Sequence, residues 1–194
     1  MSKDTTKKFT CNSNLAVTVA AHDWKVIQKV IRVACSQYGE CSWLGIGKVP
    51  TNLSNVVIDR IVFPKQENDR TASDIDDLAM VDVINNLADD EKILWWGHSH
   101  GNMGAYYSAK DDKTWDAWME QSPEFFIGTC HNVKNESFQQ VCVSGFVTQL
   151  DQSPFCFPHD EEEAKAVEEA LSQMEKPSAP IIVRAPSLAS KQMN

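Results

Sequence analysis

The apolar positions of the chain fall into short blocks whose spacing predicts strands and helices in turn. Residues 15–19 alternate along the chain as the side chains of a short strand do. Residues 21–38 carry apolar side chains at the spacing of one helix face, and Gly39 follows as a fitting helix C-cap. The segments 40–49 and 56–63 are predicted to form two partner strands.

The middle of the chain contains one segment that is apolar on both faces. It covers residues 93–100, and such a segment is typical of a strand in the centre of a sheet. A polar loop over 65–73 and a helix over 74–88 are predicted before it. A loop rich in glycine and aromatic residues over 101–107 and a helix over 108–121 are predicted after it.

The last third of the chain repeats the alternation of strand and helix. Two further strands are predicted at 125–128 and 140–147, with a turn at 132–136 between them. An amphipathic helix is predicted at 160–174, with Leu171 and Met174 on its inward face.

This order of elements indicates an α/β fold in which a mixed β-sheet is flanked by helices. Hairpin-like strand pairs beside helical connections make the sheet mixed rather than parallel. We expect a single domain over residues 11–175, which is a usual domain length. The polar residues 1–10 are predicted to be a flexible arm, and the segment 176–194, rich in proline and serine, is predicted to be disordered.

Composition narrows the function classes. The formal net charge of −9 argues against a nucleic-acid binder, which normally has a basic face. No apolar run approaches the length of a membrane span, and the N-terminus lacks the apolar core of a signal peptide, so a cytoplasmic location is predicted. The six cysteines are scattered and form no CxxC pair, which predicts reduced thiols.

Two histidines stand one residue apart at the end of the central apolar segment, and an aspartate follows eleven residues after the second. On a strand, His98 and His100 point to the same face. Together with Asp111 they form a ligand set for a zinc ion with one position left open, and such a set suits zinc better than magnesium. A simpler interpretation exists for each part. The histidines could be polar residues at a strand end, and Ser108 with Asp111 also forms a helix N-capping pattern. The neighbouring Asp112 is an alternative third ligand.

A hydrolytic zinc site also needs a base that removes a proton from water. Glu40 begins the predicted strand 40–49, which contains no other acidic residue, and is the candidate for this role. The simpler interpretation of Glu40 is a solvated acid at a strand end.

These residues resemble the motif of the JAMM (MPN+) zinc metalloproteases of the JAB domain family. The motif has an upstream glutamate, an HxH pair and an aspartate within SxxD, and here these are Glu40, His98-Ser99-His100 and Ser108 to Asp111. The resemblance covers about residues 13–150 and implies the JAB/MPN fold, an α-β-α sandwich like that of cytidine deaminases. Gly101 stands where many members have proline, and the following loop is closer to microbial and phage-type members than to eukaryotic deubiquitinases.

The resemblance also implies roles and a substrate. His98, His100 and Asp111 would hold the zinc, Glu40 would be the general base, and Ser108 would donate a hydrogen bond to the oxyanion. The family cleaves the bond after the C-terminal tail of ubiquitin or a ubiquitin-like protein, so a ubiquitin-like protein or its conjugate is the expected partner. The alternatives are a non-catalytic MPN scaffold, and a peptidase that acts on a sulfur-carrier conjugate or a phage structural protein.

Overall fold

The computed structural model describes residues 15–122, 124–150, 153–156 and 169–175. The helices are α1 (Ala21–Gln37), α2 (Asp77–Asn85) and α3 (Ala109–Gln121), with a 3-10 turn, η1 (Leu53–Asn55). The strands of the large sheet are β2 (Ser42–Lys48), β4 (Arg60–Val62), β7 (Glu91–Ser99), β8 (Phe125–His131), β9 (Ser137–Val143) and β10 (Phe146–Gln149). The shorter strands are β1 (Val17–Val19), β3 (Val56–Ile58), β5 (Gln66–Asn68), β6 (Ser73–Ile75), β11 (Phe155–Cys156) and β12 (Met174–Glu175).

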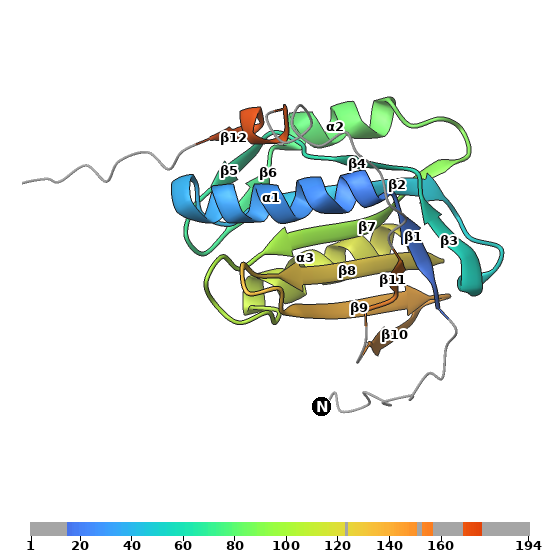
Figure 1. The fold of residues 1–194 in the computed structure, drawn as a ribbon. Helices are drawn as coiled ribbons and strands as arrows, with labels where there is room; N and C mark the ends of the chain where they lie inside the picture. Colours follow the sequence, from blue (N-terminus) through green and yellow to red (C-terminus); the bar gives the residue numbers. More distant parts are fainter. Residues whose placement is uncertain (1–14, 123, 151–152, 157–168, 176–194) are drawn as a thin grey trace, which may run out of the picture.

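A six-stranded sheet forms the centre of the molecule, in the order β10-β9-β8-β7-β2-β4. β7 runs parallel to β8 and antiparallel to β2, so the sheet is mixed, as predicted. Two three-stranded sheets, β11-β1-β3 and β12-β5-β6, complete the fold. Figure 1 shows α1 crossing one side of the large sheet and α3 lying on the other. The α/β fold with a mixed sheet flanked by helices is therefore confirmed.

β7 is the central strand that its apolar sequence predicts, and it is buried from Ile93 to its end. The register with β2 shifts at one point, because Gly45 pairs with Trp95 whereas Ile46 pairs with Ile93. Leu94 is the extra residue of this bulge. Leu94 and Trp95 therefore both pack toward α1, and the strand resumes its alternation before the histidines.

The helix α1 covers one face of the sheet. Its buried side chains include Ile27, Val30 and Ala34, three of the positions whose spacing predicts this helix face. They join Trp43 and Trp95 from β2 and β7 in the larger apolar cluster. The helix ends at Gln37, and Gly39 follows with φ of 114°.

The helices α2 and α3 pack against the opposite face. Trp115 of α3 is buried against Trp96 of β7 and Phe126 of β8, and the α2 residues Met80 and Val83 pack on the same cluster. The two sets of side chains alternate along the strands, so that Trp95 of β7 lies in one core and the next residue, Trp96, lies in the other. The amphipathic pattern predicted for 108–121 is confirmed, with Ser108 as the N-cap.

The structure corrects two predicted segments before α2. The single strand predicted over 56–63 is divided, because β3 pairs with β1 while β4 pairs with β2, and the backbone N–H of Asp59 donates to Ile46 between them. The predicted loop 65–73 contains the strand β5 and the first residue of β6. The strand β6 continues to Ile75, so the helix predicted from residue 74 begins only at Asp77. These strands were missed because their buried side chains, Gln66 and Asn68, are polar.

The structure also corrects the strands after α3. The strand predicted at 125–128 continues to His131 as β8, and it pairs along its length with β9. The strand predicted at 140–147 is a hairpin, because Ser144 and Gly145 both have positive φ and form a tight turn between β9 and β10. The predicted turn at 132–136 is present.

Several predictions concern residues that the structure does not describe, in part or in full. The arm 1–10, the tail 176–194 and most of the helix 160–174 lie outside the described residues. Residues 169–172 are helical and Leu171 packs against the α1 side of the core, as predicted for the inward face. Met174 is also buried, but it lies in the strand β12 and not in the predicted helix.

Two further predictions concern the state of the cysteines and membrane-spanning segments. Cys35, Cys41, Cys130 and Cys142 are free thiols. Among the described residues, no helix is long and apolar enough to cross a membrane.

Candidate metal centre

His98 and His100 lie at the end of β7 and point to the same face of the sheet. Both imidazoles are buried, with 1% and 3% of their surface exposed. Their Nε2 atoms lie 3.3 Å apart. The ring of Trp96 stacks on His98 with 4.6 Å between the ring centroids, and the ring of Tyr106 meets His100 edge-on at 5.2 Å. The aromatic rings hold both imidazoles in place on a rigid strand.

The backbone fixes the orientation of the second imidazole. Nδ1 of His100 lies 3.1 Å from the carbonyl oxygen of Gly104, in the loop after β7. An imidazole that donates from Nδ1 to a carbonyl presents the lone pair of Nε2 on its other side. The loop therefore prepares His100 to act as a ligand through Nε2.

The first turn of α3 brings a carboxylate to both histidines. Asp111 Oδ1 lies 3.3 Å from His98 Nε2, and Asp111 Oδ2 lies 3.2 Å from His100 Nε2. Burial alone would raise the pKa of Asp111, but its hydrogen bonds with His100 and His98 hold this pKa well below the usual range. Asp112, the alternative, is exposed. The structure thus brings Asp111, and not Asp112, to the two imidazoles.

The helix cap and the site share the same two residues. The backbone N–H of Ser108 donates to Asp111 Oδ2 at 2.7 Å, and the backbone N–H of Asp111 donates to Ser108 Oγ at 3.3 Å. This is a capping box, so the structural interpretation of the SxxD pattern is correct as well. In these contacts Ser108 Oγ only accepts, which leaves its hydroxyl proton to donate elsewhere.

Hydrogen bonds from two strands position Glu40. The backbone of Cys41, its neighbour, is joined to Ser99, because Ser99 N–H donates to Cys41 O at 2.8 Å and Cys41 N–H donates to Ser99 Oγ at 3.0 Å. Asn68 Nδ2 donates to the carbonyl oxygen of Glu40, and Glu40 N–H donates to Asp69 O at 2.7 Å. The chain approaches so closely here that a Cβ on Gly39 would lie 1.8 Å from Asp69 O, which only glycine avoids.

Glu40 is buried, with 3% of its surface exposed, and its Oε1 has no hydrogen-bond partner among the described residues. Burial raises the pKa of Glu40 to about 7, against the opposing effect of His100 and His98, and Asp111 and Asp69 raise it further. A carboxyl with a pKa near neutrality can both take up and release a proton. The prediction that Glu40 lies beside the histidines agrees with this electrostatic coupling, whereas the solvated strand-end acid does not.

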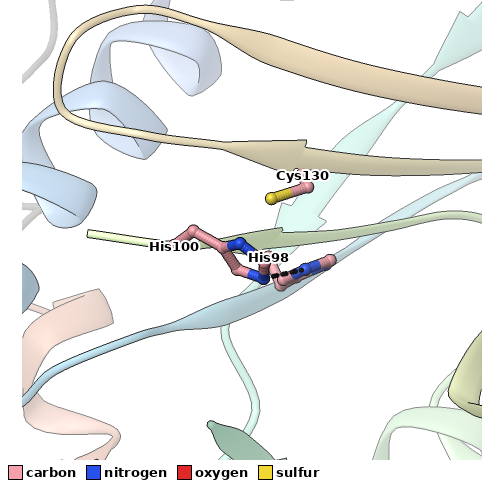
Figure 2. A group of neighbouring side chains, drawn as sticks. All are labelled: His98, His100 and Cys130. Carbon is pink, nitrogen blue, oxygen red and sulfur yellow. Dashed lines mark hydrogen bonds between the residues drawn. The ribbon is translucent and has the colours of Figure 1, made fainter. Parts of the chain in front are cut away.

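Cys130 joins the group from the neighbouring strand, although no sequence motif predicts it as part of this site. The parallel register pairs His98 with Cys130. One ligand atom each from His98, His100 and Cys130 lie within 4.8 Å of one another. Figure 2 shows these three side chains as neighbours. Burial would raise the pKa of Cys130, but hydrogen bonds with His100 and His98 lower it overall.

The donor atoms fit a metal ion. Two buried imidazole nitrogens have a thiol within reach from β8 and a carboxylate within reach from α3. Burial would lower the pKa of His100, but hydrogen bonds with Asp111 and Cys130 raise it to about 11, so the site attracts positive charge. Nitrogen, oxygen and sulfur donors of this kind bind transition metals. The group can therefore hold a metal ion.

The fold and the site together define an α/β domain with a candidate metal centre at the end of its central strand. Residues 25–142 match the family of prokaryotic homologs of the JAB domain, and this match spans more than half of the chain. The chain belongs to that family, which confirms the resemblance to JAB domains of the microbial type.

The comparison with solved structures gives a likeness of fold. The solution structure of protein DSY2949 from Desulfitobacterium hafniense superposes with a TM-score of 0.54 at 13% sequence identity. The match covers 75% of this chain and 95% of that chain. No curated protein matches the sequence.

Proposed function

We propose that this protein is a zinc-dependent peptidase or isopeptidase that cleaves the bond after the C-terminal tail of a ubiquitin-like protein. One observation carries the proposal. The buried Glu40, whose Oε1 has no hydrogen-bond partner among the described residues, is electrostatically coupled to the His–His–Asp group. Burying an acid without a hydrogen-bond partner costs folding free energy, and such groups are found most often at functional sites. Family membership adds to this support.

Each residue of the site has a role in this proposal. His98, His100 and Asp111 hold the zinc, which acts as a Lewis acid toward the scissile carbonyl group. Glu40 accepts a proton from the attacking water and passes it to the leaving amine. The hydroxyl of Ser108 donates a hydrogen bond to the oxyanion that forms on the carbonyl oxygen.

The edge of the large sheet offers a place for an extended tail. β4 is the last strand on one side of the six-stranded sheet, and it pairs with β2, which begins beside Glu40. A groove of about 780 Å³ runs along β4 toward the start of α2, lined in part by Val62, Phe63 and Leu78. An extended peptide that adds a strand to such an edge gains backbone hydrogen bonds while its side chains enter the groove.

Two alternatives differ in their demands on the site. A non-catalytic scaffold does not require a buried base with a free oxygen, so the state of Glu40 favours the enzyme. A peptidase acting on a sulfur-carrier conjugate or a phage structural protein would use the same residues. Only the choice of substrate separates that alternative from the proposal.

The test is hydrolysis of a ubiquitin-like protein that carries a fluorogenic amide at its C-terminus, measured alongside the zinc content of the chain. The wild-type protein is expected to release the fluorophore and to contain about one zinc. Glu40→Gln should lower turnover about a hundredfold to ten-thousandfold, because it removes the proton acceptor. It should leave the zinc in place, because Glu40 is not a ligand.

Glu67→Gln is the matched control, since Glu67 is an exposed glutamate on β5. It should retain wild-type turnover. Full turnover in Glu40→Gln would contradict the assignment of the base. A wild-type chain that cannot be loaded with zinc would contradict the proposal as a whole.

A further inference from the structure

Cys130 occupies a position that the described apolar cores do not use. Its side chain is fully buried, yet it belongs to neither of the two apolar clusters of the described residues. Cys142, on the adjacent strand β9, differs in this respect because it is part of the cluster beneath α3. Cys130 is therefore buried without being part of either apolar cluster.

The strand register explains where the thiol of Cys130 lies. His98 and Cys130 are paired residues of the parallel strands β7 and β8, and paired residues project to the same face of a sheet. Figure 2 shows the side chain of Cys130 on β8 beside the imidazoles of His98 and His100, and a dashed line marks the hydrogen bond between these two rings. Sγ and one nitrogen of each ring lie within 4.8 Å of one another. His98 and Cys130 are on strands, and His100 follows directly after β7 with its N–H donating to His131 O at the end of β8, so the sheet sets the spacing of the three donors.

The two histidines therefore have a further donor on each of two other elements, a carboxylate on α3 and a thiol on β8. Asp111 contacts both rings from α3, at 3.3 and 3.2 Å, and Cys130 approaches them from β8. Thiolate sulfur is the donor that zinc prefers in its structural sites, and it selects zinc over hard ions such as magnesium.

We propose that Cys130 is a fourth protein ligand of the metal in the resting protein. The inference rests on the proposed metal centre of His98, His100 and Asp111. A zinc ion with four protein donors has no position left for water, which is the arrangement of closed sites. Hydrolysis would then require that Cys130 leaves the metal, so the thiol keeps the site inactive until a substrate or another ligand displaces it.

The test uses cobalt in place of zinc, because a thiolate bound to cobalt gives an intense charge-transfer band in the near ultraviolet. The full chain, freed of metal, is titrated with cobalt, and the visible bands report cobalt binding itself. The wild-type protein should show both kinds of band. Cys130→Ser and Cys130→Ala should lose the near-ultraviolet band but keep the visible bands. Their metal affinity should fall at least about tenfold, the loss that follows removal of even an outer partner of a ligand.

Cys142→Ala is the matched control, because Cys142 is a buried thiol in the same sheet. It should keep the charge-transfer band. Visible bands without a charge-transfer band in the wild-type protein would overturn the inference, and so would a charge-transfer band that persists in Cys130→Ser. If both Cys130 variants fail to fold, cadmium NMR of the wild-type chain decides, since sulfur ligation moves the resonance far downfield and its absence there overturns the inference.

The two proposals fail separately. Hydrolysis of the ubiquitin-like amide by a protein whose cobalt shows no sulfur band would leave the peptidase proposal standing and remove the role of Cys130. A sulfur band in the wild type that Cys130→Ser lacks, with no hydrolysis by either protein, would support the ligand and remove the peptidase.

Discussion

Glu40 is the residue whose surroundings are least compatible with a purely structural role. Its carboxyl group is buried, and Oε1 lacks a hydrogen-bond partner among the described residues. Two imidazoles favour its charged form, while burial and the carboxylates of Asp111 and Asp69 disfavour it. The outcome is a pKa of about 7 instead of the ordinary 4.5.

The raised pKa of Glu40 predicts a pH-dependent cost in stability for the metal-free protein. The unfolded chain loses this proton above pH 4.5, whereas the folded chain keeps it until about pH 7. The contribution of Glu40 to stability therefore falls as the pH rises through this window and is constant above it. Glu40→Gln cannot ionise, so its melting temperature relative to wild type should rise between pH 4.5 and 7 and then level off. Thermal denaturation of the metal-free proteins at several pH values measures the difference.

Glu67→Gln serves here as well, because it removes one exposed negative charge. Its difference from wild type should not change over the same window. A difference for Glu40→Gln that is equally flat would show that the buried carboxyl does not titrate near neutrality.

The residues of the site were predictable to the extent that they share a local pattern. His98, His100 and Asp111 are close in sequence, so a strand end followed by a helix start was enough to bring them together. Glu40 could be proposed through the family motif. Cys130 and Ser99 could not be assigned roles, since both depend on strand registers, and a sequence does not show which strands are neighbours.

At the scale of the element, β7 carries the large side chains of Trp95 and Trp96 just before the two histidines, and all of them are buried. Gly97 makes this possible. A Cβ at this position would lie 2.2 Å from the indole ring of Trp43, which is fully buried on β2. The strand needs a residue without a side chain directly before His98.

Gly97→Ala is predicted to destabilise the protein by about 1–3 kcal/mol, the usual cost of forcing an extra methyl group into a packed core. The displaced Trp43 cannot move freely, because its ring also contacts those of Trp95 and His131. Urea denaturation followed by tryptophan fluorescence measures the change in the free energy of unfolding.

Gly104→Ala is the corresponding control, because an added Cβ there meets only the ring of Tyr106 at an ordinary 3.4 Å. This variant should unfold at nearly the same urea concentration as wild type. Equal stability of Gly97→Ala and wild type would mean that the sheet adjusts to the methyl group without cost.

Element boundaries were predictable where one face of an element is apolar, and not elsewhere. The helices α1 and α3 were found by their spacing, and β7 by its continuous apolar run. The hairpin of β5 and β6 was missed, since its buried residues are amides that bond to the backbone beside Glu40. Gln66 and Asn68 are polar because their side chains donate hydrogen bonds to the backbone carbonyl groups of Ser42 and Glu40.

At the scale of the whole molecule, the candidate metal centre joins elements that otherwise meet only through side-chain packing. His98 and His100 belong to the sheet, whereas Asp111 belongs to α3 on its surface. A metal bound to all three would tie the helix to the central strand, and it would bind the folded chain far better than the unfolded one.

Zinc is therefore predicted to raise the melting temperature. At a free concentration one hundred times the dissociation constant, binding adds about 2.7 kcal/mol, which corresponds to roughly 5–10 °C for a chain of this size. Differential scanning fluorimetry with zinc and with a chelator measures this shift. Asp111→Asn should reduce it, because a neutral amide is a weak ligand for zinc.

Asp112→Asn provides the comparison, as it removes an exposed carboxylate from the same helical turn. Its zinc-dependent shift should equal that of wild type. An undiminished shift in Asp111→Asn would exclude this carboxylate from the metal site.

The class of fold was predictable from the alternation of helices and strands, but the order of strands was not. The parallel pairing of β7 with β8 is set by α3, which crosses the sheet between them. The polar hairpin and the divided strand at 56–63 follow from contacts between distant parts of the chain. Local patterns do not contain that information.

Ser99 lies between the two histidines and faces away from them. Its two hydrogen bonds to Cys41 connect the end of β7 with the residue after Glu40. These two bonds tie the segment that bears the carboxylate to the strand end that bears the imidazoles. We therefore expect thermal motion of the sheet to change the spacing between the base and the imidazoles less than it changes the position of either in the molecule.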